Sequence, residues 1–153
     1  MLVIKPGHTS RKISVQNALK VWGEENPESL EAIAPNKYNG LLIEVQQISK
    51  EIYLESMARC RAAADGWESE LEVYSAMGIL VASGLKGLHG LEDEDGNAVK
   101  LASVDGKLDG DSLAILHDND LMLDMWRIVR HYNELTAIEK KAFSEQAQPT
   151  LRS

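Results

Sequence analysis

The sequence predicts a mostly α-helical, compact domain with a short β-hairpin at about residues 88–101 and a short N-terminal strand. Apolar residues that recur at helical spacing over several long stretches predict the helices. An Asp-Gly turn signal between two short runs predicts the hairpin. The length of 153 residues fits one helical domain, residues 1–153, whose last residues form a short flexible tail at about 148–153.

The first third of the chain indicates a strand and two short helices. Residues 2–4 (Leu-Val-Ile) form the short strand, which ends before Pro6. Ser14 is placed to cap a first helix, which Gly23 closes. Pro27 stands at the first position of a second helix, where its missing amide hydrogen costs nothing, and Pro35 ends that helix.

A long helical pattern extends from about residue 38 to residue 64. Its apolar residues step by four, three and four positions, which places them on one face. These residues are Leu41, Val45, Ile48 and Ile52. Beyond Met57 the chain is rich in alanine, which has the highest helix propensity. The Asp65-Gly66 pair ends the helix.

The clearest helical pattern follows, from residue 67 to residue 88. Its members recur at helical spacing; they are Trp67, Leu71, Tyr74, Gly78, Val81, Leu85 and Leu88. Asp65 and Glu68 form a capping pair at its start. Gly78 and Gly84 lack side chains, and we therefore expect another helix to approach closely there.

The stretch GLHGLEDEDGNAVKL, residues 87–101, contains four consecutive acidic residues and invites comparison with a calcium loop. An EF-hand needs oxygen ligands at positions 1, 3 and 5, Gly at position 6 and Glu at position 12. With Gly96 at position 6, Leu91 falls at position 1 and Ala102 at position 12, so an EF-hand is excluded. The same Asp-Gly pair instead predicts a hairpin turn with solvated acidic side chains. No metal or cofactor is expected.

Three further helices are expected after a polar loop at residues 102–110: residues 112–116, residues 121–135, and a last helix to about Ala147. Thr136 and Glu139 have the spacing of a capping box at the start of the last helix.

The helix at residues 121–135 carries two apolar stripes. One is Leu121, Met125, Ile128 and Tyr132, and the other is Met122, Trp126 and Val129. Two interpretations are open. In the first, the helix is buried on two sides. In the second, the Met122 stripe is a partner-binding face, because Met and Trp are adaptable or anchoring residues at interfaces. The second interpretation assigns partner binding to Met122, Trp126, Val129 and Met77.

Charge and motifs limit the classes of function. The net charge of −8 and the few basic runs argue against nucleic acid and anionic membranes as partners. The single cysteine, Cys60, suits a reducing compartment such as the cytoplasm. The four histidines are scattered, and no phosphate loop, nucleophile elbow or Cys-x-x-Cys is present. No catalytic residue is assigned, and we expect no enzyme.

Residues 85–99 and 113–120, set between their flanking helices, resemble the corresponding segments of the tail assembly chaperones of long-tailed bacteriophages. The resemblance covers roughly the last 80 residues. The chain departs from the family pattern in two places: Leu88 or His89 stands where an aromatic residue is common, and no Pro follows Asp118.

The resemblance implies a non-enzymatic protein of the bacterial host cytoplasm. Such chaperones bind the helical tape-measure protein and keep it soluble while tail tube subunits assemble around it, so the tail tube protein is a second candidate partner. Several copies on one client would add avidity, and a homo-oligomer is compatible with this role. Two alternatives remain: a structural head–tail joining or tail-terminating subunit of the virion, and a small enzyme or regulator that uses His89 with the nearby carboxylates.

Overall fold

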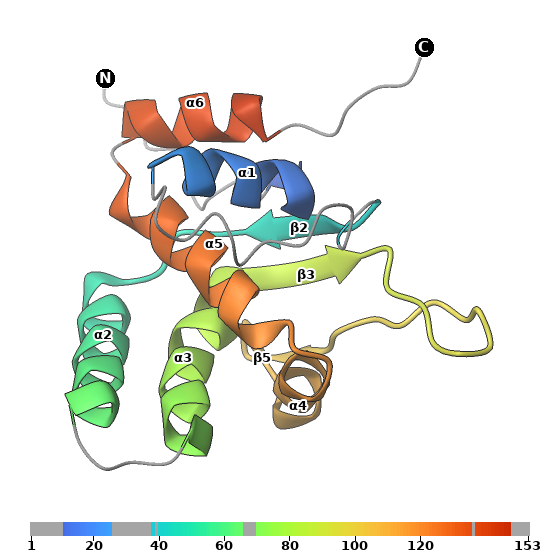
Figure 1. Cartoon of the computed structure of the whole chain (residues 1–153), viewed down its shortest axis with the longest axis horizontal. Helices are drawn as coiled ribbons and strands as arrows, with labels where there is room; N and C mark the ends of the chain where they lie inside the picture. Colours follow the sequence, from blue (N-terminus) through green and yellow to red (C-terminus); the bar gives the residue numbers. More distant parts are fainter. Residues whose placement is uncertain (1–10, 26–37, 39, 66–69, 136, 148–153) are drawn as a thin grey trace.

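The structure, a computed structural model, describes residues 11–25, 38, 40–65, 70–135 and 137–147 (Figure 1). In chain order the elements are β1 (Arg11–Ser14), α1 (Val15–Glu25), β2 (Leu42–Val45), α2 (Lys50–Asp65), α3 (Glu70–Gly84), β3 (Leu85–His89), β4 (Ser103–Val104), β5 (Lys107–Leu108), α4 (Gly110–Asp118), α5 (Met122–Glu134) and α6 (Ala137–Gln146). Helices predominate and the sheet is small and antiparallel, which confirms the predicted fold class.

Several predictions fall outside the described residues. They are the strand at residues 2–4, the helix that begins at Pro27, the capping residues Glu68 and Thr136, the first residue of the pattern that begins at Trp67, and the tail at residues 148–153.

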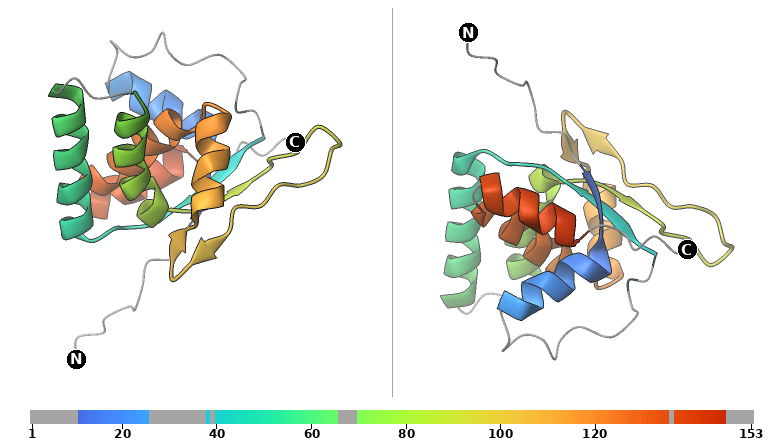
Figure 2. Two further views of the ribbon diagram at one scale, coloured as in Figure 1. Left: turned by 90° about the horizontal axis from the view of Figure 1, so that it is seen from below. Right: turned by 90° about the horizontal axis from the view of Figure 1, so that it is seen from above.

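The central sheet has the strand order β1-β2-β3. In its middle strand, Ile43 lies opposite Ile13 of β1 and opposite Leu88 of β3, and all three side chains are buried. Helix α5 crosses in front of the sheet, with α1 and α6 above it and α2, α3 and α4 below it in the view of Figure 1. Viewed from below and from above, the three lower helices keep their places side by side, with α3 between α2 and α4 (Figure 2).

The prediction of one long helix from residue 38 to residue 64 is wrong in its first half. Residues 42–45 form the central strand β2, and the helix α2 begins only at Lys50. A spacing of four residues fits a strand as well as a helix, because four is an even number and alternate residues share a strand face. Leu41, Ile43 and Val45 are accordingly buried, while Leu42 and Glu44 are half-buried. Pairing with strands on both sides decides between the two periods.

The helix predicted to run to residue 88 ends at Gly84, and the next five residues form β3. The spacing predicted a helix here because Leu85 and Leu88, which are three residues apart, face the same side. The register explains this: Leu85 lies opposite Val45 and Gly87 opposite Glu44, so the strand contains one extra residue. This β-bulge gives a strand the three-residue spacing of a helix.

The prediction that Gly23 closes the first helix is wrong, because α1 continues to Glu25. Two other predicted features are confirmed. The Ser14 side chain accepts a hydrogen bond from the Asn17 amide at 3.2 Å and so caps α1. The acidic turn is closed by hydrogen bonds from Val99 N to Leu91 O at 2.8 Å and from Asp93 N to Asn97 O at 2.9 Å. This short hairpin lies within the predicted range. A second hairpin, β4–β5, lies inside the segment predicted as a polar loop.

Candidate functional site

An open groove of about 560 Å³ lies between α2, α3 and α4, and we call it the α3 groove. Its lining is more apolar than polar. Helix α3 supplies the floor through Ser75, Gly78, Ile79 and Ala82. The spacing of three, one and three residues places these side chains on one face of the helix. The groove therefore follows the axis of α3.

Helix α3 has no polar face along most of its length. No charged residue occurs from Val73 to Gly84. A helix that is apolar all round is usually buried on all sides. One side of α3 meets this expectation, because Leu80 and Val81 are fully buried in the core. The other side forms the floor of the α3 groove, where Ile79 and Ala82 are half-buried and Ser75 is exposed, so this uncharged helix face is only partly covered by the described part of the chain.

The walls of the groove come from helices that are fixed by local hydrogen bonds. Asp109 caps α4 by accepting a hydrogen bond from the Ser112 amide at 2.8 Å. That hydrogen bond lowers the pKa of Asp109. Ser112 also binds both backbone groups of Ala102, at 2.8 Å and 3.2 Å, which ties the start of α4 to the preceding loop. The α4 wall is therefore held in a defined position.

His117 lies in the α4 wall beside α3. Its ring packs on Tyr74 with 4.8 Å between the ring centroids. The Nδ1 atom of His117 is buried and has no hydrogen-bond partner among the described residues. A buried polar atom without a partner costs free energy.

The four residues predicted to bind a partner do not form one exposed face. Met77, Met122 and Val129 are buried, and Trp126 is half-buried. Helix α5 packs against α3 and also against α1, so it is buried on two sides, as the first interpretation of its stripes predicts. Met122 alone of the four lines the α3 groove. A partner could reach the other two buried side chains only by opening the core.

A second cavity, of about 300 Å³, lies between α1 and α5. Two cation–π pairs line it: the Arg127 guanidinium lies 4.9 Å from the centre of the Trp22 ring, and that of Arg130 lies 5.0 Å from the centre of the Trp126 ring. Arg127 forms an ion pair with Asp124, and Arg130 forms one with Glu134. These charges stabilise the fold and leave little net attraction for an anion.

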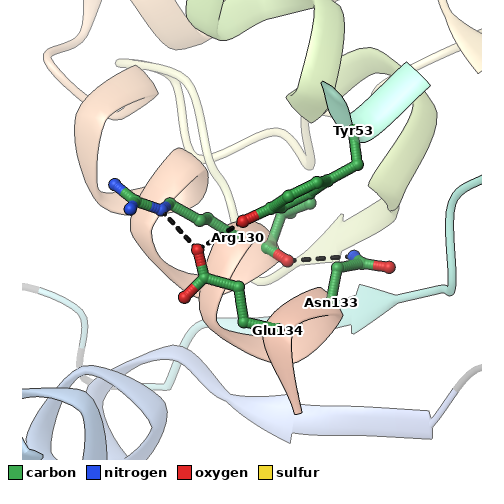
Figure 3. Close-up of polar contacts among 5 residues, drawn as sticks. Tyr53, Arg130, Asn133 and Glu134 are labelled. Atoms are coloured by element: carbon green, nitrogen blue, oxygen red, sulfur yellow. Dashed lines mark hydrogen bonds and ion pairs between the residues drawn. The ribbon is translucent and has the colours of Figure 1, made fainter. Parts of the chain in front are cut away.

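A polar cluster joins α2 to the end of α5 (Figure 3). Tyr53 Oη donates to Glu134 Oε1 at 2.5 Å, and Arg130 Nε donates to the same oxygen at 2.7 Å. Beside them, Asn133 donates to the carbonyl of Val129 at 2.9 Å. Burial raises the pKa of Glu134, but the bonds from Tyr53 and Arg130 outweigh it and hold the pKa below its ordinary value. Burial, followed by the bond to Glu134, raises the pKa of Tyr53.

Replacement of Glu134 by glutamine tests this cluster. A carboxylate with a lowered folded pKa stabilises the fold above its unfolded pKa, and this stability is lost as the pH falls through the folded pKa. Glu134→Gln should lower the free energy of unfolding at neutral pH by roughly 0.2–1 kcal/mol, because solvent screens a partly exposed pair. The difference should shrink as the pH falls below the ordinary pKa of 4.5, and the two proteins should converge once the pH is below the lowered folded pKa. Urea unfolding across this pH range measures the difference. Exposed Glu145→Gln is the control, and a difference that persists in acid contradicts the prediction.

The structure shows the surroundings of His89 and Cys60. His89 Nε2 lies 2.6 Å from Glu44 Oε1 of the neighbouring strand. The carboxylate that His89 contacts therefore does not belong to the acidic turn. Cys60 is half-buried, and burial raises the pKa of its thiol, which disfavours a reactive thiolate.

Within the described ranges no three His, Cys, Asp or Glu side chains group as a metal site. In the same ranges no helix has the length and apolar character needed to cross a membrane.

Comparisons with known proteins add no assignment. No protein-family model matches this chain, and neither the curated proteins nor the solved structures contain a match.

Proposed function

We propose that this chain is a non-enzymatic assembly chaperone that shields an apolar segment of a partner in the α3 groove. The observation that carries the proposal is the partly exposed, uncharged face of α3 in the groove, at Ser75, Ile79 and Ala82. Hydrophobic burial favours its coverage by an apolar partner segment. A partner that exposes such a segment would otherwise aggregate, so covering it is a chaperone activity.

The sequence resemblance suggests which partner this is: the tape-measure protein of a long-tailed bacteriophage, bound in the host cytoplasm before tail tube subunits assemble around it. The tape-measure protein is long and helical, and helices bind other proteins by laying an apolar face into a groove. The charge of this chain, −8, keeps the complex soluble. Both features suit a protein that keeps an insoluble client in solution.

Co-expression tests the proposal. The chain should be produced together with the tape-measure protein proposed as its client, and the soluble fraction should be analysed by pull-down. We expect the client to be soluble and to co-purify only when this chain is present. A client that stays insoluble and unbound would contradict the proposal.

The composition of purified particles separates the chaperone from the structural alternative. A chaperone should be absent from the finished virion, because its site on the tape-measure protein is taken over by the tail tube. A head–tail joining or tail-terminating subunit should be present in a fixed copy number. Mass spectrometry of purified virions distinguishes the two outcomes.

A further inference from the structure

We infer that the α3 groove receives an amphipathic helix whose apolar stripe is flanked by basic side chains. The inference names the kind of segment that the groove binds, and it rests on the proposed function only for the identity of the client. Three observations carry it: the shape of the groove, the small residues on its floor and the acidic residues along its margin.

The shape favours a helix as the occupant. The groove has a helix on each side and a helix as its floor, and α3 lies between α2 and α4 in both directions of view (Figures 1 and 2). An extended peptide gains most of its affinity from main-chain hydrogen bonds to a strand edge. The floor of this groove is a helix, whose interior backbone groups bond within the helix. Side-chain packing is thus the main interaction available, and helices use it.

Small residues on the floor permit close packing. Ser75, Gly78 and Ala82 are spaced by three and four residues, so they follow one another along the groove. A Cβ atom added at Gly78 would clash with nothing, since it would only make an ordinary van der Waals contact with Leu113 Cδ1 at 3.9 Å. The distance between packed helices depends on the side chains at their contact. A helix can therefore approach α3 closely at this point.

Acidic residues along the margin predict the charge of the occupant. Asp111 and Asp118 are exposed and are seven residues apart in α4, so they lie on one side of that helix, next to Ala114 of the groove lining. On α2, Glu51 is exposed, while the Glu55 carboxylate in the lining is paired with Arg59 at 3.0 Å. Charge complementarity favours lysine or arginine on the occupant at these margins.

Lys107 also lines the groove, next to the start of α4. A helix carries a partial negative charge at its C-terminus, because its last carbonyl groups are unpaired. Lys107 therefore suits a bound helix whose C-terminal end lies there. Lys107 lies in β5, just before α4, whereas the acidic residues lie on α4 and α2, which agrees with a basic-flanked helix.

Two synthetic helical peptides test the inference. Both carry the same leucine and alanine stripe; one has lysine beside the stripe and the other has glutamate. Fluorescence anisotropy should show that the lysine peptide binds at least about tenfold more tightly, since charge complementarity suppresses the wrong partner. Equal affinity for the two peptides, or no binding of either, would overturn the inference.

Two variants locate the binding in the α3 groove. Gly78→Leu fills the floor and should weaken lysine-peptide binding by about tenfold or more, because even small steric misfits in a packed contact are costly. Ala58→Leu, on an exposed part of α2, is its matched control. Circular dichroism verifies that both variants are folded. Binding that is unaffected by Gly78→Leu would overturn the assignment of the site.

Charge reversal tests the margin separately. Asp111→Lys combined with Asp118→Lys should weaken lysine-peptide binding about three- to tenfold and strengthen binding of the glutamate peptide. Glu92→Lys with Glu94→Lys makes the same change of net charge in the exposed hairpin and should have little effect. Equal effects of the two double variants would mean that net charge, and not the margin, controls affinity, which would overturn this part of the inference.

The same variants separate this inference from the proposed function. A tape-measure protein that co-purifies equally well with wild type and with Gly78→Leu would leave the chaperone proposal standing and overturn the groove as its site. Peptide binding that responds as expected, combined with no binding of the tape-measure protein, would support the groove and contradict the proposed client.

Discussion

Replacement of Gly84 by alanine should destabilise the protein by about 3 kcal/mol, because overpacking a filled core forces side chains or backbone to move. A Cβ atom at Gly84 would lie 2.3 Å from Val129 Cγ1 and 3.3 Å from Ile48 Cγ2. Val129 is fully buried in α5, so it cannot turn away into solvent. The loss should appear as a lower midpoint of urea unfolding with an unchanged slope.

Gly78→Ala is the matched control, because it makes the same change in the same helix, where the added Cβ meets only an ordinary van der Waals contact with Leu113 Cδ1 at 3.9 Å. It should be neutral or should stabilise α3 by about 0.5–1 kcal/mol, since alanine favours helix over glycine. Removing the clashing group should rescue the first variant: Gly84→Ala with Val129→Ala should lose less stability than the sum of the single changes. Equal stabilities of Gly84→Ala and Gly78→Ala would contradict the close approach of α5 to α3.

Asp124→Ala should destabilise the fold by about 3 kcal/mol, because removing one partner of a buried ion pair leaves the other uncompensated. Asp124 is 8% exposed; it accepts a hydrogen bond from the Tyr38 hydroxyl, and one from Arg127 Nη1 at 2.9 Å. Burial, followed by the hydrogen bond to Asp124, raises the pKa of Tyr38 well above its ordinary range. The hydroxyl therefore stays protonated and keeps donating.

The partners of Asp124 should contribute less than Asp124 itself. Tyr38→Phe removes one neutral donor and should cost about 1–2 kcal/mol. Asp118→Ala, the same substitution at an exposed position of α4, should stay within about 0.5 kcal/mol of wild type. Urea unfolding at neutral pH measures all three. A cost for Asp124→Ala no larger than that for Asp118→Ala would show that the buried cluster does not stabilise the fold.

The sequence predicts well those features whose causes are local. Ser14 caps α1, and the Asp-Gly turn forms the hairpin around Gly96, which has φ +81°. Both depend on residues within a few positions of one another, so the same chemistry acts before and after folding. The acidic turn, which first suggested calcium, is a hairpin whose Asp93 side chain accepts hydrogen bonds from the amides of Asp95 and Asn97.

Boundaries between helix and strand depended on distant residues. The apolar spacing at Leu41 and Val45 fits either structure, and only pairing with β1 and β3 makes this segment a strand. The extra residue in β3 likewise gives Leu85 and Leu88 a spacing that suggests a helix. In both places a local pattern has two solutions, and the partner strands select one of them.

The α3 groove is the feature that sequence reasoning missed. The available signal was the uncharged stretch of α3, which is too apolar for a helix with one exposed face. One of the two interpretations of the sequence placed partner binding at Met77, Met122, Trp126 and Val129, and the structure buries three of them. An apolar stripe has the same pattern whether it meets the core or a partner, so burial cannot be read from the stripe itself.

The sequence by itself determined the helical class, the Ser14 cap, the Asp-Gly turn and the net negative charge, because these follow from each residue and its near neighbours. The tertiary structure alone decided where β2 and β3 form and which face of α3 is covered. It also decided that α2 and α4 border the other face of α3. Those outcomes depend on contacts between segments far apart in the chain. Such contacts are selected by packing and strand pairing over the whole fold, which no local pattern records.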